Sequence, residues 1–248
     1  MEGATMNDEV LILDNVGKTF SGFELEHISF SVKPNSIMGL IGENGAGKTT
    51  IINLILNEIK KTHGNIYLWG KDHIKHEMLI KENLGVVFDD FHFPELLTSY
   101  EIGQFMKHIY SHWDSKTYQS FLDQFKLPKN KAVKEFSRGM KVKTSLAVAL
   151  SHGAHFLILD EATSGLDPIM RNEVLGILKH FVSTDQNSIL LSSHITDDLN
   201  QIADEITFIH KGKLVFTKSK NELSKAGTID DVMLKYVNGG RKDEWIDS

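Results

Sequence analysis

The sequence contains no cysteine, only four prolines among 248 residues, and no long uncharged apolar run. Without cysteine the chain has no disulfide, no thiolate metal site and no cysteine nucleophile, which suits a reducing compartment. No stretch approaches the roughly 18 to 20 apolar residues that cross a bilayer, and the residues from Met1 to Met6 carry no export signal. We therefore expect a soluble cytoplasmic protein, for which Met6 is an alternative natural start.

An excess of basic charge is also absent. The chain has 27 lysines and arginines against 33 acidic residues, which gives a formal net charge of −6. Because non-specific binding to nucleic acid needs a basic surface, we expect no nucleic-acid partner. The hydrophobic content of 41% over 248 residues is enough to bury a substantial core, so we expect one globular domain.

What the sequence does contain is a glycine-rich run from Gly42 to Thr49 that matches the phosphate-binding loop at all eight positions. Glycines allow backbone N–H groups to converge on phosphates where a Cβ would intrude. Lys48 adds a charge at the outer phosphates, and the Thr49 hydroxyl can join a Mg²⁺ shell. The loop therefore predicts a nucleoside triphosphate site whose contacts are Gly42, Asn44, Gly45, Ala46, Gly47, Lys48, Thr49 and Thr50.

The residues around the loop supply the context that this motif requires. An apolar run over residues 37–41 predicts a strand before the loop. Apolar residues then recur at helical spacing up to Ile59, and Lys60, Lys61 and Gly64 indicate the end of the predicted helix. The competing interpretation is a glycine-rich turn that fits the pattern by chance, and the strand and helix on the correct sides argue against it.

The order of the remaining patterns indicates a core interrupted by helices. Short strands are predicted within residues 11–16, 23–32 and 66–70, and a compact buried strand over 84–88. Thr98 and Glu101 have capping-box spacing, and Ile102, Phe105, Met106 and Ile109 follow on one helical face. A second helix carries Tyr118, Phe121, Leu122 and Phe125 and ends before Pro128.

Strand and helix patterns alternate again in the C-terminal half. Strands are predicted over 156–159 and 189–191, with a helix from about Pro168 to Val182 between them, for which Asp167 is the predicted cap. A hairpin over 206–216 follows. The predicted fold is α/β: a P-loop NTPase core with a mainly parallel sheet, an antiparallel β layer and an inserted helical subdomain. Within one domain over 1–248, we assign the core to 10–88 and 151–217, the helical subdomain to 89–150, and a C-terminal helical extension to 218–248 with a tail from Asn238.

Two carboxylates, Asp160 and Glu161, end the predicted strand over 156–159. In NTPases with this loop, the first such acid faces the Mg²⁺ that the loop threonine holds, which assigns Asp160 to the metal. Glu161 can then polarise the water that attacks the γ-phosphate. Acids often finish strands without any such role, but the upstream phosphate loop favours the catalytic interpretation.

A further set of motifs resembles a known family. Ser137 and Gly139 lie in the run from Phe136 to Lys143, a segment from Ser164 to Asp167 follows the two acids, and His194 follows the next strand. In this order, the motifs resemble those of the ATP-binding-cassette ATPases across roughly residues 10 to 217. The resemblance implies that ATP and Mg²⁺ are bound.

The family pairs head to tail, so the resemblance implies that two copies of this chain sandwich two nucleotides. Ser137 and Gly139 would then contact the γ-phosphate held by the partner copy, as a helix N-terminus suits an anion. The segment ending at Asp167 resembles the part that crosses the dimer axis, and His194 resembles the switch histidine that holds the γ-phosphate and the attacking water. Phe20 matches the aromatic residue that stacks on adenine, with Phe23 as a competitor.

Two departures from the family pattern stand out. Asp89 occupies the place where the family usually has glutamine, and as a carboxylate it is expected to reach Mg²⁺ or the catalytic water. The signature run has Phe136, Arg138 and Met140 where leucine, glycine and glutamine are common. These variants resemble bacterial exporter ATPases whose membrane permease is a separate polypeptide.

The resemblance implies the ATPase subunit of a membrane transporter, an exporter that rests on the cytoplasmic face of the membrane through its permease. Phe91, Phe93, Pro94 and Leu96 lie where the family's membrane partner docks, although packing within the helical subdomain would also explain them. The alternative function is a soluble ATPase of the same family in a non-transport role, such as metal-cluster assembly. A kinase with the same loop would leave the Ser137 motif, the two acids and His194 without a joint explanation.

Overall fold

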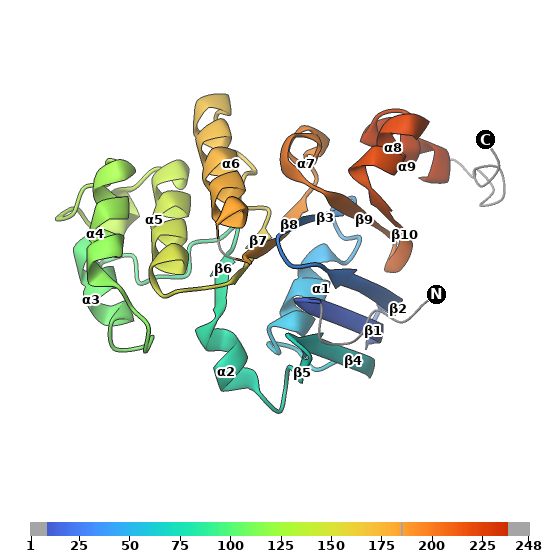
Figure 1. The fold of residues 1–248 in the computed structure, drawn as a ribbon, viewed down its shortest axis with the longest axis horizontal. Helices are drawn as coiled ribbons and strands as arrows, with labels where there is room; N and C mark the ends of the chain where they lie inside the picture. The colour runs from blue at the N-terminus through green and yellow to red at the C-terminus, as the bar shows by residue number, and fades with distance from the viewer. Residues whose placement is uncertain (1–8, 185, 238–248) are drawn as a thin grey trace.

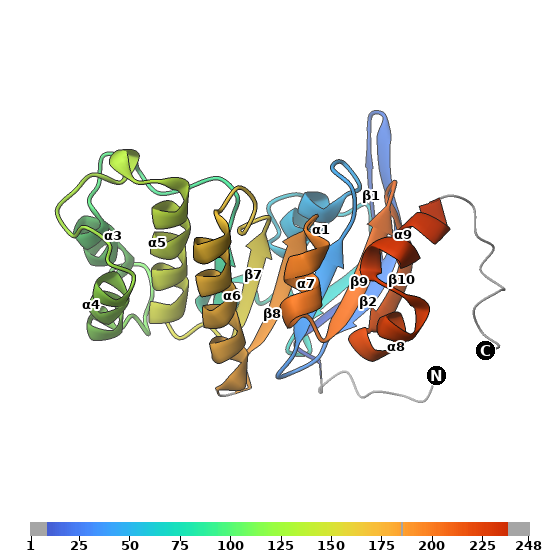
Figure 2. The ribbon, with the colours of Figure 1, turned by 90° about the horizontal axis from the view of Figure 1, so that it is seen from above.

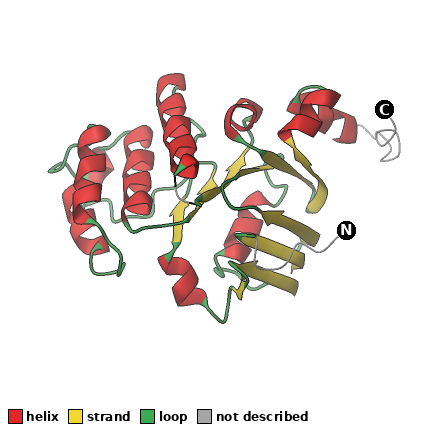
Figure 3. Cartoon of the chain, viewed as in Figure 1, coloured by secondary structure: helices red, strands yellow, loops and turns green. Residues whose placement is uncertain are grey.

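The computed structural model of the chain describes residues 9–184 and 186–237. The expectations about a start at Met6 and a tail from Asn238 lie outside these residues. Ten strands form one curled sheet across the described residues, in the order β5-β4-β1-β2-β10-β9-β3-β8-β7-β6 (Figure 1). Figure 3 shows the strands running from the middle of the molecule toward one side, with helices above and below the central strands.

One half of the sheet is parallel, as the sequence predicts. It contains β6 (Leu84–Val87), β7 (Phe156–Asp160), β8 (Ser188–Ser193), β3 (Ile37–Ile41) and β9 (Glu205–His210). Every residue of β3, β7 and β8 is buried. Helices cover this half on both faces, which is why these strands are continuous apolar runs rather than alternating ones.

The other half of the sheet is antiparallel and forms the expected β layer. It contains β1 (Leu11–Phe20), β2 (Phe23–Val32), β4 (His63–Leu68) and the short β5 (Lys71–Asp72), and β10 (Lys213–Ser219) joins it to β9. The hairpin predicted over 206–216 is confirmed as β9 and β10.

Helices flank the sheet on both faces. The one nearest the phosphate loop is α1 (Lys48–Ile55), which lies on the opposite face from α6 (Pro168–Ser183) and α7 (Thr196–Ile202) in Figures 1 and 2. The others are α2 (Glu77–Glu82), α8 (Lys220–Ala226) and α9 (Ile229–Val237). None of the helices within residues 9–184 and 186–237 is long and apolar enough to span a bilayer.

Three helices gather at one end of the molecule, beyond β6. They are α3 (Ser99–Met106), α4 (Ser115–Gln124) and α5 (Arg138–Ser151), with the short 3-10 turn η1 (Val133–Glu135) before α5 (Figure 2). The predicted capping box of Thr98 and Glu101 is present at the start of α3. The predicted apolar face is only half buried, because Ile102 and Met106 face the core whereas Phe105 and Ile109 are exposed.

The helix after the phosphate loop is shorter than its apolar pattern predicts. It ends at Ile55, Leu56 closes it, and Asn57 turns to a left-handed φ of 58°. Ile59 still packs against the core, but from the turn that follows. Gly64 does not mark a helix end; it lies in β4, where an added Cβ would lie 2.2 Å from the Asn15 carbonyl oxygen. The apolar spacing up to Ile59 therefore correctly indicates which residues pack against the core, but not how far the helix extends.

Candidate functional site

The carboxyl ends of three adjacent parallel strands meet at one edge of the sheet. In the register of the sheet, Ile41 at the end of β3 pairs with Ser193, and Asp160 at the end of β7 pairs with Ser192. The phosphate loop, Glu161 and His194 therefore leave the sheet side by side. Open α/β folds bind their ligands at this edge.

The phosphate loop wraps a cavity of about 220 Å³ at the start of α1. Gly45 and Gly47 have φ angles of 79° and 115°, a region that glycine adopts without the strain of a side chain. The glycines also pack against the protein itself: a Cβ on Gly42 would lie 2.4 Å from the Ile209 carbonyl oxygen, and one on Gly47 would lie 2.9 Å from Leu25. The cavity is lined by Phe23, Asn44, Gly45, Gly47, Lys48, Thr49, Thr50 and Glu161.

Lys48 is buried at the base of this cavity, with 5% of its surface exposed. Its ammonium donates hydrogen bonds to the carbonyl oxygens of Gly42, at 2.7 Å, and of Glu43, at 3.3 Å. Glu161 Oε1 lies 3.2 Å from the same nitrogen, without hydrogen-bond geometry. The loop and the carboxylate thus hold a buried cation directly at the N-terminus of α1.

Glu161 also contacts His194 across the edge of the sheet. Its Oε2 atom lies 2.6 Å from His194 Nδ1, which donates to the carboxylate. Glu161 itself has a φ of 51°, a rare backbone conformation for a residue with a side chain, and such strain gathers at functional sites. The structure thus brings together three of the predicted catalytic residues, Lys48, Glu161 and His194.

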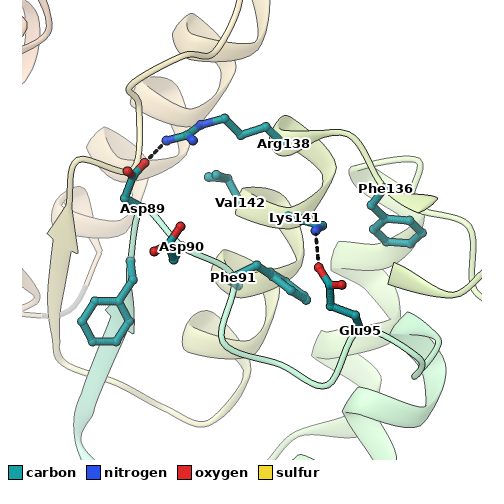
Figure 4. A pocket seen from close by; sticks show the side chains of 10 residues that line it. Asp89, Asp90, Phe91, Glu95, Phe136, Arg138, Lys141 and Val142 are labelled. Atoms are coloured by element: carbon teal, nitrogen blue, oxygen red, sulfur yellow. Dashed lines mark hydrogen bonds and ion pairs between the residues drawn. The ribbon is translucent and has the colours of Figure 1, made fainter. Parts of the chain in front are cut away.

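A second group of predicted residues lies around the first turn of α5. Ser137 caps this helix by accepting a hydrogen bond from the Met140 amide, and Gly139 lies against Met170 of α6. Asp89 forms an ion pair with Arg138, which Figure 4 shows at the rim of a pocket of about 380 Å³. None of these residues lines the cavity at the phosphate loop. Asp89 and Arg138 line the pocket of Figure 4 instead.

Three further predicted residues have definite surroundings. Asp167 caps α6 by accepting hydrogen bonds from the amides of Ile169 and Met170, as expected for the residue before Pro168. Phe20 is 42% exposed, whereas Phe23 lines the cavity and its ring would be 3.1 Å from a Cβ on Gly47. The two rings lie 6.4 Å apart, so both stand near the mouth of the phosphate loop.

Comparison with known proteins places this geometry in a family. The family model described as "ABC transporter" matches residues 25–164, which include the phosphate loop, the first turn of α5 and the two acids. The chain belongs to the ABC transporter ATP-binding family. Nucleotide binding by this ABC domain follows from that membership.

Named relatives of the ABC domain are transport proteins of bacteria. It is 35% identical to "Bacitracin transport ATP-binding protein BcrA" of Bacillus licheniformis over 77% of this chain and 63% of that protein. It is 31% identical to "Lantibiotic transport ATP-binding protein SrtF" of Streptococcus pyogenes over 78% of this chain and 83% of that protein. The chain spans less than two thirds of the length of BcrA, at 63% for the Bacillus protein and 65% for that of Enterococcus faecalis.

Solved structures show the same fold. A structure described as the "ATP binding subunit of ABC transporter" superimposes with a TM-score of 0.83 at 22% identity, over 92% of this chain and 99% of that one. The predicted α/β class, with its nucleotide-binding core, is therefore confirmed for the ABC domain.

The oxygen atoms beside the loop fit a magnesium ion. Asp160 is buried, and its Oδ1 atom has no hydrogen-bond partner among the described residues; the same holds for the Ser192 hydroxyl. Mg²⁺ prefers such oxygen ligands and takes the rest from water and substrate phosphates. Within the described residues, no three histidine or acidic side chains gather into a complete metal cage. The donor set therefore suits a metal that arrives with a phosphate group.

The sequence interpretation missed a buried polar cluster behind the site. Asp198 of α7 is 2% exposed, and its Oδ1 atom lies 3.9 Å from the Nε of Arg171 on α6. Burial raises the pKa of Asp198, while the nearby Thr163 hydroxyl and the Arg171 charge act in the opposite direction. No local pattern in the sequence marks this contact, because Arg171 and Asp198 are 27 positions apart and lie on different helices.

Proposed function

We propose that this chain is the ATP-binding and ATP-hydrolysing subunit of a membrane transporter, an exporter with a separate permease. The observation that carries the proposal is the contact of Glu161 with both Lys48 and His194 beside the phosphate loop. A base, a cation and a histidine at the entrance of a helix N-terminus suit the hydrolysis of a phosphoanhydride.

Each residue at this edge has a role in the proposed reaction. Lys48 and the amides of the loop would bind the β- and γ-phosphates, and Thr49 and Asp160 would hold Mg²⁺, which would neutralise phosphate charge. Glu161 accepts a proton from the attacking water. His194 positions Glu161 through the 2.6 Å contact and lies close to where the γ-phosphate would end. Phe20, with its exposed ring, stacks on the adenine.

We further propose that two copies pair head to tail around two MgATP molecules. In each copy, Ser137 and Gly139 at the start of α5 complete the site of the partner. The proposal is supported by the separation of this turn from the cavity at the phosphate loop of the same chain. The segment from Ser164 to Asp167 then lies at the dimer axis.

The role in transport is supported by the relatives and by the surface of α3. The named relatives are a bacitracin transport and a lantibiotic transport ATP-binding protein. In the segment predicted to dock, Phe91 and Phe93 are half-buried and pack against the core, whereas Pro94 and Leu96 are exposed, Leu96 at 76%. Exposed apolar side chains on or next to α3 form a surface for a membrane partner: Leu96, Tyr100, Phe105 and Ile109.

The variant Glu161→Gln tests the catalytic assignment. Loss of a positioned general base lowers turnover by about 10²- to 10⁴-fold, whereas the similar size of glutamine preserves ATP binding. We expect a protein that binds MgATP, hydrolyses it far more slowly and accumulates as a dimer in size-exclusion chromatography. Wild-type turnover in this variant would exclude Glu161 as the base, and a solitary protomer with bound MgATP would count against the shared site.

Co-purification tests the transport role. The tagged wild-type chain, recovered from detergent-solubilised membranes, should carry a protein with several membrane spans. Phe105→Glu should lose that protein, because it places a charge in the α3 surface. Met78→Glu is the matched control: Met78 is 89% exposed on α2, away from α3. Recovery of a water-soluble partner only would favour a non-transport function.

A further inference from the structure

The two departures from the family pattern contact each other. Asp89 follows β6, Arg138 is the first residue of α5, and their side chains form an ion pair (Figure 4). They are 49 positions apart in the sequence, so no local pattern reveals the contact. Asp89 stands where the family usually has glutamine, and Arg138 where it commonly has glycine. In the structure, each of these charged residues is the ion-pair partner of the other.

Arg138 also reaches a third segment. Its Nε atom donates a hydrogen bond of 2.7 Å to the carbonyl oxygen of Ser164, in the loop between β7 and α6. A Cβ on Gly165 would lie 3.2 Å from the same nitrogen, so the guanidinium lies directly against this loop. The planar guanidinium presents donors in two fixed directions, one toward Asp89 and one toward Ser164, which a lysine ammonium does not do.

We propose that Asp89 and Arg138 form a positioning pair that ties the first turn of α5 to the segments after β6 and after β7. The pair sets where Ser137 and Gly139 stand, because they flank Arg138 on the same turn. Its consequence for hydrolysis rests on the shared site proposed above. Asp89 acts through Arg138 and is not a ligand of Mg²⁺.

Charge favours this assignment over a role at the metal. The Asp89 carboxylate already faces a guanidinium, and a divalent cation placed at the same carboxylate would be repelled by it. Asp89 also differs from Asp160, whose buried Oδ1 atom has no hydrogen-bond partner among the described residues, because the Asp89 carboxylate already has a partner in Arg138. Both partners are partly exposed, at 49% for Asp89 and 41% for Arg138, so solvent weakens the pair. An exposed ion pair changes an equilibrium by up to about fivefold.

Hydrogen exchange in the nucleotide-free chain tests the pair directly. The Ser164 amide donates to the Glu161 carbonyl and the Leu166 amide to that of Thr163, so both are protected. Asp89→Asn should speed the exchange of both amides about twofold to fivefold, because it frees Arg138, which donates to the Ser164 carbonyl in this loop. In an Arg138→Met background the same change should have no further effect. An Asp89→Asn effect of equal size in both backgrounds, or none in either, would overturn the proposal.

Two further measurements address the site. In a Glu161→Gln background, Asp89→Asn and Arg138→Met should each weaken ATP-dependent dimerisation about twofold to fivefold, and the double variant should match the single ones. With Glu161 intact, the Mn²⁺ concentration for half-maximal hydrolysis should be unchanged in Asp89→Asn. A tenfold rise in that concentration, absent from Arg138→Met, would show that Asp89 is a metal ligand and would overturn the pair.

The neighbouring pair of Lys141 and Glu95 provides the matched control. It joins the first turn of α5 to the segment after β6, with 2.8 Å between Lys141 Nζ and Glu95 Oε1 (Figure 4). Among the described residues, the hydrogen bond of Lys141 goes to Glu95, whereas that of Arg138 goes to Ser164. Lys141→Met should therefore leave exchange at Ser164 and Leu166 unchanged; an equal acceleration would mean that any lost charge on α5 has the effect, against the proposal. If Glu161→Gln fails to dimerise with ATP, the shared site fails, while the exchange result still decides the pair.

Discussion

The cavity at the phosphate loop and the first turn of α5 are two charged regions built in opposite ways. At the loop, the side chains of Lys48 and Glu161 are 6% and 16% exposed, and the nearby Asp160 Oδ1 has no hydrogen-bond partner among the described residues. At the turn, Arg138 and Asp89 are open to solvent and contact each other. The first region is buried and contains a polar atom without a hydrogen-bond partner among the described residues, whereas the charges of the second region are exposed and paired with each other.

This difference has energetic consequences. Charges in a low-dielectric interior interact several times more strongly than charges at the surface. A buried carboxylate oxygen without a partner is costly and gains from any cation that reaches it. Exposed pairs contribute about 1 kcal/mol or less, so they rearrange easily. The loop is therefore suited to hold a ligand, and the turn to shift when a partner approaches.

The largest expected contrast is in nucleotide affinity. Lys48→Ala removes the buried ammonium and with it the two proposed hydrogen bonds to the β- and γ-phosphates. A hydrogen bond to a charged group contributes about 1.5 to 3 kcal/mol, so ATP binding should weaken roughly 100-fold or more. Ser137→Ala should leave the ATP affinity of the isolated protomer within about twofold, because Ser137 does not line the cavity of its own chain and the lost cap costs only about 1 kcal/mol of stability. It should weaken only the ATP-dependent dimerisation. Equilibrium binding of a fluorescent ATP analogue at low protein concentration measures both.

Mixing the two variants sharpens the comparison. A dimer of one Lys48→Ala and one Ser137→Ala chain contains one site in which both halves are wild type. If each site is shared, the mixture should recover hydrolysis that neither variant shows alone. No recovery in mixtures that form dimers, or an equal loss of protomer affinity in Ser137→Ala, would mean that the turn and the loop serve the same chain's nucleotide.

The two regions also differ in how far the sequence predicts them. The loop, the buried strand before it and the Asp160 and Glu161 pair are local patterns, and parallel strands bring their ends together by rule, so the contacts of Glu161 follow. The caps at Thr98 and Asp167 are equally local, and both are present. The pairing of Asp89 with Arg138 joins segments 49 residues apart and depends on how α5 lies against the sheet.

Errors in the predicted elements have the same origin. The apolar spacing after the loop predicts a longer α1, but Ile59 reaches the core from a turn, since tertiary packing satisfies burial without a helix. Phe105 has helical spacing with Ile102 and is nevertheless exposed. Helical spacing of apolar residues therefore does not distinguish a face that packs in the core from a face that is exposed for a binding partner.

The smallest expected difference between the two regions is in stability. It is tested by replacing one glycine in each region, Gly42 at the loop and Gly139 at the turn. A Cβ on Gly42 would lie 2.4 Å from the backbone oxygen of Ile209, which cannot move without disturbing β9. A Cβ on Gly139 would lie 2.9 Å from the side chain of Met170, an unbranched chain with several rotatable bonds. The same added methyl group therefore meets a fixed obstacle at the loop and a flexible one at the turn.

Gly42→Ala should lower the free energy of unfolding by about 2 kcal/mol, as overpacking of a close contact does, and the melting temperature by about 4 to 8 °C. Gly139→Ala should change the same free energy by less than about 1 kcal/mol, because the gain in helix propensity partly offsets the displacement of Met170. Thermal and urea unfolding of the nucleotide-free chains measure both values. Equal destabilisation would mean that the turn is as rigid as the loop, and α5 would then be unable to adjust its first turn to a partner's nucleotide.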